Sequence, residues 1–476
     1  MNAPIARLFV VVIVLFAVLI GFTSRWTLFE ADALNANAKN QRPTLTQQRI
    51  RRGAIQARDG TLLARSTRRG DKTYTRAYPR GPLFAHAVGY SFTRFGRSGL
   101  EQARNDDLTG TGNELGSLFD RLSGAEPEGD DVRTTLDPGA QRIALEALGD
   151  HKGAVVALDP RTGAVRVMAS APSYDPNSIG RPRTLTRLNR DEGRSPLLNR
   201  TTQAGYPPGS TMKVVTAIAA IDSGEYEPDS RVDGANAKPI SGVPLNNFGG
   251  AAFGDITLTE ALTKSVNTVW AEVGEKLGAG TMGDYMRKLG FGEQAAVDLP
   301  SDERRASGRF PDGRLAPVDT DSTDIGRLAI GQEKLAVTPL QMAMVASAVA
   351  NGGRLMRPHI SDRVIDRDGR TVTRVEPDEL AQVMSADSAA KVGAMMSKVV
   401  QEGSGTAAAL TGIDVAGKTG TAEVDRRCGP NQVWFIAFAP AADPRVAVAV
   451  TLECSQGTGG VVAAPIAKQV MQELLK

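Results

Sequence analysis

The chain has 476 residues, which is long enough for two or three domains with their own hydrophobic cores. Its 56 basic and 53 acidic residues leave a net charge of +3, so the overall charge gives no electrostatic reason to expect a nucleic-acid partner. The 2 cysteines and 3 histidines (His86, His151 and His359) are scattered without the spacing of a metal site, and neither a metal nor a cofactor is expected.

A membrane anchor is the first predicted element. Residues 8–24 carry no charged side chain, and Arg7 and Arg25 flank them. The run is at the short end of the roughly 17–25 residues that span a bilayer, and the apolar core of a cleaved signal peptide is the alternative. We favour a retained single-pass anchor because no small-x-small cleavage site directly follows, and because Trp26 suits a membrane interface. Residues 1–7 are then expected in the cytoplasm and the rest of the chain outside the plasma membrane.

The region after the anchor, residues 25–130, is predicted to be a small mixed domain. It is rich in Arg, Gly, Thr and Asp and shows little helical periodicity. Its last stretch, Ser123–Asp131, is acidic and rich in turn-forming residues, as linkers and loops are. We therefore place the second domain at residues 131–476.

The second domain shows strand patterns at both ends and a helical block between them. Asp159–Gly163 carries Pro and Gly where a hairpin needs them, between two strand-like runs. The predicted strands are 153–158, 165–168, 415–424, 433–438 and 445–452, and the predicted helices are 138–148, much of 209–400, and 465–475. This order predicts an α+β fold in which helices cover a five-stranded sheet and a separate subdomain is all helical.

Cys428 and Cys454 are a candidate disulfide. They flank the predicted strands 433–438 and 445–452 and could meet at one end of a hairpin. A cysteine pair in an extracellular domain is often bridged. Two unrelated buried thiols are the alternative.

Ser210-Thr-Met-Lys213 is the first of three short motifs that carry chemistry. Tyr206–Gly209 interrupts the backbone before it, so Ser210 is expected in the first turn of a helix, where the helix dipole favours developing negative charge. Lys213 is three residues further on and faces the same side. A serine needs a base to become a nucleophile, and lysine can be that base only when burial or a nearby positive charge, here Lys418, lowers its pKa. Alone, the motif also fits a helix-capping serine followed by a surface lysine.

Ser265-Val-Asn267 is the second motif. The Ser265 hydroxyl could relay a proton between Lys213 and a leaving group, and the Asn267 amide could hold a substrate carbonyl. Alone, this pattern also fits a polar loop between two helices.

Lys418-Thr-Gly-Thr421 is the third motif, in a segment with strand-like alternation. Lys418, Thr419 and Thr421 would bind a substrate carboxylate, and Gly420 would let the substrate backbone approach closely. The backbone N–H groups of Thr421 and Ser210 would form an oxyanion hole.

Two other kinds of site fit less well. Gly412–Thr419 matches the phosphate-binding pattern G-x-x-x-x-G-K-[ST], but Gly420–Pro430 after it is rich in turn formers where that motif needs a helix. A Ser-His-Asp hydrolase is disfavoured because the sequence has no G-x-S-x-G motif.

In order and spacing, the three motifs resemble the active-site set of the penicillin-recognising serine acyltransferases. The whole chain resembles class B penicillin-binding proteins, and within them the penicillin-binding protein A group of actinobacteria. Outside the motifs, the likeness is carried by Arg52–Ala64, Gly99–Glu101, Gly153–Pro160, Ser173–Asn177, Asn199-Arg200, Tyr206–Gly209, Ile330–Gln332 and Trp434–Pro440. The region before Asp131 is too short for a glycosyltransferase domain, which sets aside the bifunctional class A relatives.

The resemblance implies a fold and an activity. The fold would be a serine β-lactamase-like transpeptidase domain with a five-stranded antiparallel sheet, preceded by a pedestal (dimerisation-like) domain and a transmembrane helix. The activity would be that of a peptidoglycan D,D-transpeptidase, in which Ser210 attacks the D-Ala-D-Ala bond of one stem peptide and passes the acyl group to an amine on a second. Lys213 would be the general base and Ser265 the proton relay, and β-lactams would acylate Ser210.

The resemblance also implies a cellular role, and it leaves alternatives open. The expected partners are a membrane glycan polymerase of the SEDS family and divisome proteins, in septal wall synthesis during cell division. A D,D-carboxypeptidase or a β-lactamase would use the same Ser210 and Lys213 with water as the acceptor. Outside the enzymes, the alternative is a scaffold that binds muropeptide or antibiotic without turnover.

Overall fold

The structure is a computed structural model that describes residues 3–25, 48–70, 73–111, 128–320, 322–424 and 429–476. Its first element is helix α1, Ala3–Ser24, which contains the predicted apolar run 8–24. Helix α1 is long and apolar enough to cross a membrane, with a hydropathy of 2.9, and none of it is buried against the rest of the protein. A signal sequence has the same length and composition, so the helix indicates membrane targeting and agrees with a retained anchor.

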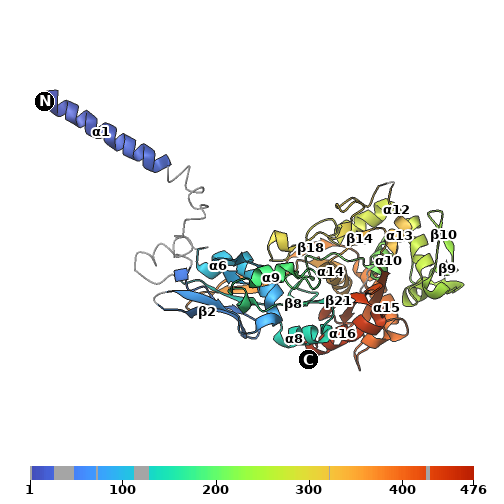
Figure 1. Ribbon diagram of the computed structural model, residues 1–476. Helices are drawn as coiled ribbons and strands as arrows, with labels where there is room; N and C mark the ends of the chain where they lie inside the picture. The colour runs from blue at the N-terminus through green and yellow to red at the C-terminus, as the bar shows by residue number, and fades with distance from the viewer. Residues whose placement is uncertain (1–2, 26–47, 71–72, 112–127, 321, 425–428) are drawn as a thin grey trace.

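A six-stranded sheet forms one end of the body (Figure 1). Its strand order is β17-β16-β6-β1-β2-β3, with β6 parallel to β1 and the other neighbours antiparallel. The strands are β1 Ile55–Gln56, β2 Leu62–Arg68, β3 Tyr74–Ala77, β6 Asp131–Thr134, β16 Ser361–Ile365 and β17 Thr371–Arg374. We call it the pedestal sheet. Because β6, β16 and β17 come from the region assigned to the second domain, a cut at residue 130 would divide this sheet, and the predicted boundary stays a prediction.

Short helices and a hairpin lie between β3 and β6 in the chain. They are η2 Gly81–Phe84, α4 Ala85–Val88, the hairpin of β4 Ser91–Phe92 and β5 Gly96–Arg97, α5 Gly99–Ala103, and α6 Asn105–Thr109. A buried ion cluster ties them to the sheet, because the fully buried Glu101 pairs with Arg52 at 2.9 Å and with Arg76 at 2.5 Å.

The predicted five-stranded antiparallel sheet is confirmed. Its order is β19-β20-β21-β7-β8. Strand β7, which comes first in the chain, is therefore an inner strand, and β19 is an edge strand. The strands are β7 Gly153–Leu158, β8 Val165–Ala171, β19 Ala416–Glu423, β20 Asn431–Ala439 and β21 Val446–Ser455. The central strands are apolar on both faces because helices cover both sides.

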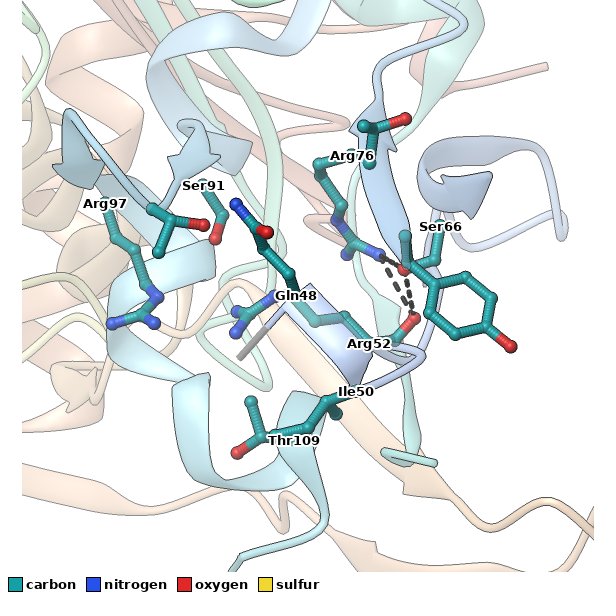
Figure 2. Close-up of a pocket in the computed structure, with 11 residues that line it drawn as sticks. Gln48, Ile50, Arg52, Ser66, Arg76, Ser91, Arg97 and Thr109 are labelled. Carbon is teal, nitrogen blue, oxygen red and sulfur yellow. Dashed lines mark hydrogen bonds between the residues drawn. The ribbon is translucent and has the colours of Figure 1, made fainter. Parts of the chain in front are cut away.

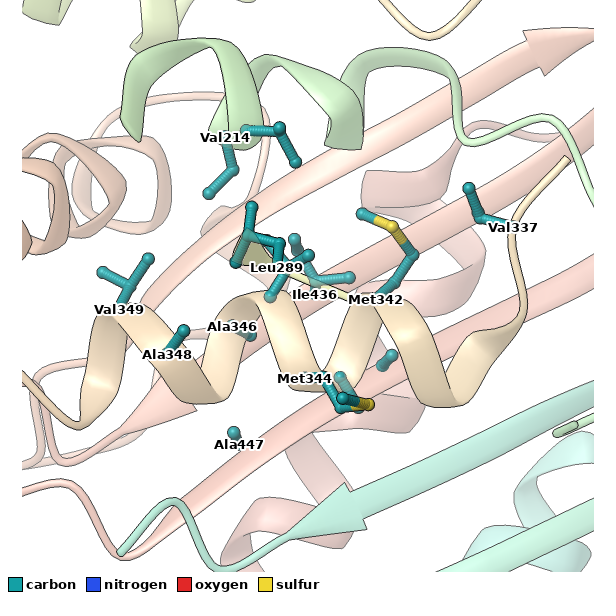
Figure 3. Packing of buried hydrophobic residues seen from close by; sticks show 14 of the residues in the cluster. Val214, Leu289, Val337, Met342, Met344, Ala346, Ala348, Val349, Ile436 and Ala447 are labelled. Carbon is teal, nitrogen blue, oxygen red and sulfur yellow. The ribbon is translucent and has the colours of Figure 1, made fainter. Parts of the chain in front are cut away.

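One face of the five-stranded sheet packs against α8, Pro138–Leu148, and α16, Gly459–Leu474. The other face packs against α14, Pro339–Ala350, and α15, Ala386–Gln401. In Figure 3, Val214 of helix α10, Met212–Asp222, lies on one side of α14, and Ala447 of β21 lies on the other. The small side chains Ala346 and Ala348 let α14 approach its neighbours closely, and its main contacts are with β21, β20 and β7 of the sheet.

The segment between the strands carries several helices, as predicted, but helices make up less than half of residues 209–400, and the segment also carries short ribbons. With α10, its helices are α11 Leu258–Thr263, α12 Asn267–Lys288 and α13 Ile325–Ala329. The ribbons pair β9 Arg231–Asp233 with β12 Asp255–Thr257, β10 Lys238–Ile240 with β11 Val243–Leu245, β13 Gly308–Arg309 with β14 Leu335–Ala336, and β15 Arg354–Met356 with β18 Glu379–Gln382. The remaining short helices are η3 Pro176–Ser178, α9 Thr184–Arg190, η4 Gly209–Thr211, η5 Phe248–Gly250, η6 Ser301–Glu303 and η7 Thr406–Ala408.

Two predicted elements differ from the structure or lie partly outside it. The final helix begins at Gly459 and contains Pro465, where the sequence predicted its start, because tertiary packing holds the first turn even though proline removes one helical hydrogen bond. The predicted bridge includes Cys428, which lies outside the described residues. Its neighbour Gly429 lies against Cys454, since a Cβ at Gly429 would be 2.2 Å from the Cys454 carbonyl oxygen.

Candidate active site

Ser210 lies in a tight turn that leads directly into α10. The turn is η4, and Gly209 before the serine has a φ of +51°, which favours glycine. Backbone from two other segments encloses this turn: a Cβ on Gly209 would be 2.9 Å from the Thr421 carbonyl oxygen, and one on Gly331 would be 2.0 Å from the Gly209 carbonyl oxygen. The half-buried Ser210 is therefore fixed by packing against the third motif, at the start of a helix as predicted.

Lys213 brings the first and second motifs together. It is fully buried, and its Nζ donates to the Ser265 carbonyl oxygen at 2.8 Å, to Ser265 Oγ at 3.2 Å and to Asn267 Oδ1 at 2.7 Å. Because Lys213 is three residues after Ser210 across the junction of η4 and α10, the amine lies one turn from the serine. The surface-lysine alternative for this motif is excluded.

Ser265 lies in the link between α11 and α12, a position that the polar-loop alternative for this motif also described. Its φ is +57°, a backbone conformation that is uncommon for any residue other than glycine and that occurs often at functional sites. Helix α11 begins at a complete capping box between Thr257 and Glu260, which fixes its start. This link places Asn267 so that its Nδ2 donates to the Asn246 carbonyl oxygen at 3.0 Å.

Lys418 brings the third motif to the same hydroxyl. It is fully buried on β19, and its Nζ donates to Ser265 Oγ at 2.9 Å and to the Thr419 carbonyl oxygen at 3.1 Å. Two lysine amines from different elements therefore contact one serine hydroxyl. The structure thus brings Lys213, Ser265, Asn267 and Lys418 into one cluster.

Burial controls the charge of both lysines. Desolvation, followed by the charge of Lys418, holds the pKa of Lys213 well below its ordinary value of 10.5. Burial lowers the pKa of Lys418 from 10.5 to about 7. At neutral pH, Lys213 is therefore suited to accept a proton, and Lys418 can hold one.

The remaining residues of the third motif line the free edge of the five-stranded sheet. Gly420 is buried, and a Cβ there would lie 2.9 Å from each of three neighbours, including the Pro208 carbonyl oxygen. Thr419 Oγ1 is 2.6 Å from Ser404 Oγ, and Thr421 Oγ1 accepts from the N–H of Gly459 at the start of α16. Since β19 is an edge strand, its outer backbone groups can pair with an extended peptide.

Several supporting residues were not assigned roles from the sequence. Trp434 Nε1 donates to the Pro207 carbonyl oxygen at 2.9 Å, and its ring packs edge-on against Tyr206 at 6.2 Å. The Tyr206 hydroxyl in turn donates to Glu453, which also pairs with the buried Arg200. The sequence does show polar groups in buried segments, at Tyr206 and Arg200, which need hydrogen-bond partners. Their shared partner Glu453 could not be identified from the sequence because it lies about 250 positions further along the chain.

The comparisons with known proteins agree with this geometry. Residues 153–472 match the family described as the penicillin binding protein transpeptidase domain, and residues 52–132 match the penicillin binding protein A dimerisation domain. The first match covers more than half of the chain. The chain therefore belongs to the penicillin-binding protein transpeptidases, a class of serine acyltransferases.

Relatives that align with the whole chain indicate the group within this family to which the chain is similar. The peptidoglycan D,D-transpeptidase PbpA of Mycolicibacterium smegmatis is 36% identical over 503 residues, covering 100% of this chain and 99% of the relative. PbpA of Mycobacterium tuberculosis is 35% identical over 504 residues with the same coverage. The predicted resemblance to the penicillin-binding protein A group is confirmed.

Solved structures of the same group superpose on the fold. The ceftriaxone acyl-enzyme complex of penicillin-binding protein A from M. tuberculosis has a TM-score of 0.82 and 33% identity, covering 90% of this chain and 100% of that one. The penicillin G acyl-enzyme complex of the same protein has a TM-score of 0.80 and 34% identity, with the same coverage. The predicted fold class is therefore confirmed.

Proposed function

We propose that this chain is a peptidoglycan D,D-transpeptidase that works through an acyl-enzyme on Ser210. The observation that carries the proposal is the cluster in which the buried amines of Lys213 and Lys418 share the Ser265 hydroxyl beside the Ser210 turn. Relatives that align with the whole chain carry the name peptidoglycan D,D-transpeptidase, and an acyl-enzyme complex is known for penicillin-binding protein A from M. tuberculosis.

In the acylation step, Ser210 Oγ forms a bond to the carbonyl carbon of the penultimate D-Ala, and the neutral amine of Lys213 takes the proton of the Ser210 hydroxyl. The peptide C–N bond then breaks, and the leaving D-Ala nitrogen receives a proton through Ser265. A base is required because a serine hydroxyl is a weak nucleophile at neutral pH. The lowered pKa of Lys213 supports this role because it favours the neutral amine, which is the form that can accept a proton.

Substrate binding follows from the edge position of β19. The donor peptide would add to this edge as a strand, with Asn267 holding one of its carbonyl groups. Its terminal carboxylate would meet Lys418, Thr419 and Thr421. Gly420 contributes through packing instead, because a Cβ there would lie 2.9 Å from the Pro208 carbonyl oxygen, so the glycine lets β19 fit against the Ser210 turn. The N–H groups of Ser210 and Thr421 would hold the developing oxyanion, and the close packing of Gly209 on Thr421 supports their proximity.

Hydrolysis is the alternative that uses the same residues, since a D,D-carboxypeptidase or β-lactamase differs only in the acceptor of the acyl group. A direct test supplies both acceptors: purified full-length chain, a stem peptide that ends in D-Ala-D-Ala, and an excess of a labelled D-amino acid. We expect release of D-Ala and a product that carries the label. Release of D-Ala with only the shortened peptide as product would instead assign a carboxypeptidase, and absence of turnover with intact peptide would assign a scaffold.

We also propose that the enzyme is held in the plasma membrane by α1, with residues 1–7 in the cytoplasm and the catalytic body outside. The length and apolar character of α1 support this arrangement. Arg7, at the N-terminal end of the uncharged run 8–24, agrees with the rule that positive charges stay on the cytoplasmic side. An oxidising location would also allow the bridge between Cys428 and Cys454. Thiol labelling of unreduced and reduced protein checks the bridge, and protease access to intact cells and to spheroplasts checks the topology.

For the cellular role, we propose septal wall synthesis with a SEDS-family glycan polymerase and divisome proteins as partners. The support is the likeness to the penicillin-binding protein A group and the presence of a pedestal on a single anchor. Depletion of the protein should reduce the incorporation of fluorescent D-amino acids at the septum. Reduced incorporation along the cell wall with normal septal labelling would assign elongation instead.

A further inference from the structure

A cation-rich cavity lies in the pedestal region, apart from the Ser210 cluster. Its volume is about 50 Å³, and it lies between strands β2 and β3, the β4–β5 hairpin and the chain that leads into β1. Figure 2 shows Arg97 on one side of the cavity and Arg76 on the other, with Gln48 between them. Since a water needs roughly 10–15 Å³ by this measure, the cavity can hold a few waters or one group of phosphate size.

The charges around the cavity do not balance. Three guanidinium groups line it, from Arg52, Arg76 and Arg97. Glu101 neutralises part of this charge by pairing with Arg52 and Arg76, and it is the one fully buried carboxylate that faces them among the described residues. Arg97 also feels the exposed Asp106 at longer range, but it forms no ion pair with a carboxylate of the described segments.

Two of the guanidinium groups keep donors that no protein group accepts. The Arg76 side chain is 2% exposed, and its Nη1 and Nε donate to backbone carbonyl oxygens and to Glu101, while Nη2 has no acceptor in the described part of the chain. The half-buried Arg97 likewise has a buried Nε without an acceptor there. A buried donor left unpaired costs free energy comparable to a lost hydrogen bond, and more when it is charged.

Hydroxyl groups complete the lining. Ser91 and Thr93 come from the β4–β5 hairpin, and Ser66 comes from β2, where it already receives Arg76 Nη1 at 3.4 Å. Forked guanidinium donors with nearby hydroxyls are the usual ligands of a tetrahedral oxyanion, whose several oxygens can accept from all of them. A carboxylate has only two oxygens, which are fewer than this lining can serve.

We propose that this pedestal cavity is a phosphate-binding site, formed by Arg76 and Arg97 with the hydroxyls of Ser91 and Thr93. Bound phosphate would supply the missing negative charge and accept from Arg76 Nη2 and Arg97 Nε. Two sources share this chemistry: free inorganic phosphate and the headgroup of a phospholipid. A lipid source is included because Gln48, which lines the cavity, is only 24 positions along the chain from Ser24, the end of the proposed membrane helix.

Equilibrium dialysis of the full-length protein in detergent with radiolabelled inorganic phosphate, at constant ionic strength, tests the site. Arg97→Gln should weaken binding about tenfold or more, because a charge-assisted hydrogen bond is lost. Arg94→Gln is the matched control, since it removes the same charge from the same exposed hairpin without lining the cavity. Unchanged acylation of Arg97→Gln by benzylpenicillin shows that this variant is folded. If Arg97→Gln does not fold, the double variant Ser91→Ala and Thr93→Val is tested in its place.

Loss of phosphate binding in Arg97→Gln but not in Arg94→Gln supports the site. Competition then separates the sources: displacement by short-chain phosphatidylglycerol at lower concentration than by unlabelled phosphate assigns a lipid headgroup, and weaker displacement assigns the free anion. No binding by the wild-type chain at millimolar phosphate, or equal binding by all variants, would overturn the proposal.

Discussion

The pH dependence of acylation is the sharpest prediction of the two-lysine cluster. If Lys213 is the base, the second-order rate of acylation by a β-lactam follows the fraction of enzyme in which its amine is neutral. A lysine with the ordinary pKa of 10.5 would raise this rate almost tenfold for each pH unit up to that value. Because burial and Lys418 hold the pKa of Lys213 well below 10.5, we expect the rate to stop rising long before pH 10.

The magnitude follows from the pKa values. For an unperturbed lysine, the rate would increase about a thousandfold between pH 7 and pH 10. For this site we expect a smaller increase, because the lowered pKa of Lys213 makes its amine neutral at a lower pH than that of an ordinary lysine. Above about pH 7 Lys418 loses its proton, and with it the charge that attracts the β-lactam carboxylate, so the rate should fall again. The pKa of Lys418 is lowered from 10.5 to about 7. Since one pKa unit corresponds to about 1.4 kcal/mol, protonating Lys418 costs about 5 kcal/mol more in the folded protein than in water.

Rapid-quench labelling with a fluorescent penicillin between pH 5 and 10 measures the profile. A Lys418→Met variant separates the two groups: it should lose the alkaline fall, acylate more slowly overall, and shift the acid limb to higher pH because the charge that lowers the pKa of Lys213 is gone. A wild-type rate that climbs tenfold per unit through pH 9 to 10 would refute the assignment of Lys213 as a buried base.

Three further predictions test other parts of the structure. Lys213→Ala should slow acylation by roughly 10²–10⁴-fold or more, and near-normal labelling would remove Lys213 from the role of base. Gly331→Ala should displace the Ser210 turn and reduce labelling, because its Cβ would lie 2.0 Å from the Gly209 carbonyl oxygen, whereas Gly369→Ala, with a similar positive φ and open space, should label normally. Glu101→Gln should lower the unfolding free energy at pH 7 by about 3–5 kcal/mol in urea titrations, since two buried arginines lose their partner. Its arginine partners lower the pKa of Glu101, so this stabilisation should be present above pH 4.5 in the wild type and be lost as the pH falls through the folded-state pKa.

Local patterns in the sequence predicted much of the fold and the core of the site. The helical pattern predicted to open at Leu136–Pro138 and to run through Leu148 agrees with α8, Pro138–Leu148. In the structure Asp137 caps this helix and Pro138 starts it, and both signals are local. The hairpin at Asp159–Gly163 and the strands beside it have equally local causes. The three motifs name the residues that carry chemistry because each motif lies within one short segment.

What the sequence did not predict depends on contacts between distant segments. The packing of Gly331 on Gly209 and the network of Glu453 join residues whose spacing carries no periodic signal. The strands β16 and β17 join the pedestal sheet although more than 200 residues separate them from β6, and strand pairing at that distance is set by the whole fold. The early start of α16 follows from its fit against the sheet, where a Cβ on Gly459 would be 2.2 Å from the Trp434 carbonyl oxygen.

The most direct test of the central claim is mass spectrometry of the full-length protein after incubation with benzylpenicillin, beside its Ser210→Ala variant. The account predicts a stable adduct of one benzylpenicillin that maps to the peptide containing Ser210 and is absent from the variant. An adduct on another residue, or equal labelling of the variant, would contradict the assignment of Ser210 as the nucleophile. A folded wild-type protein that leaves penicillin intact without any adduct would contradict the acyl-enzyme chemistry itself.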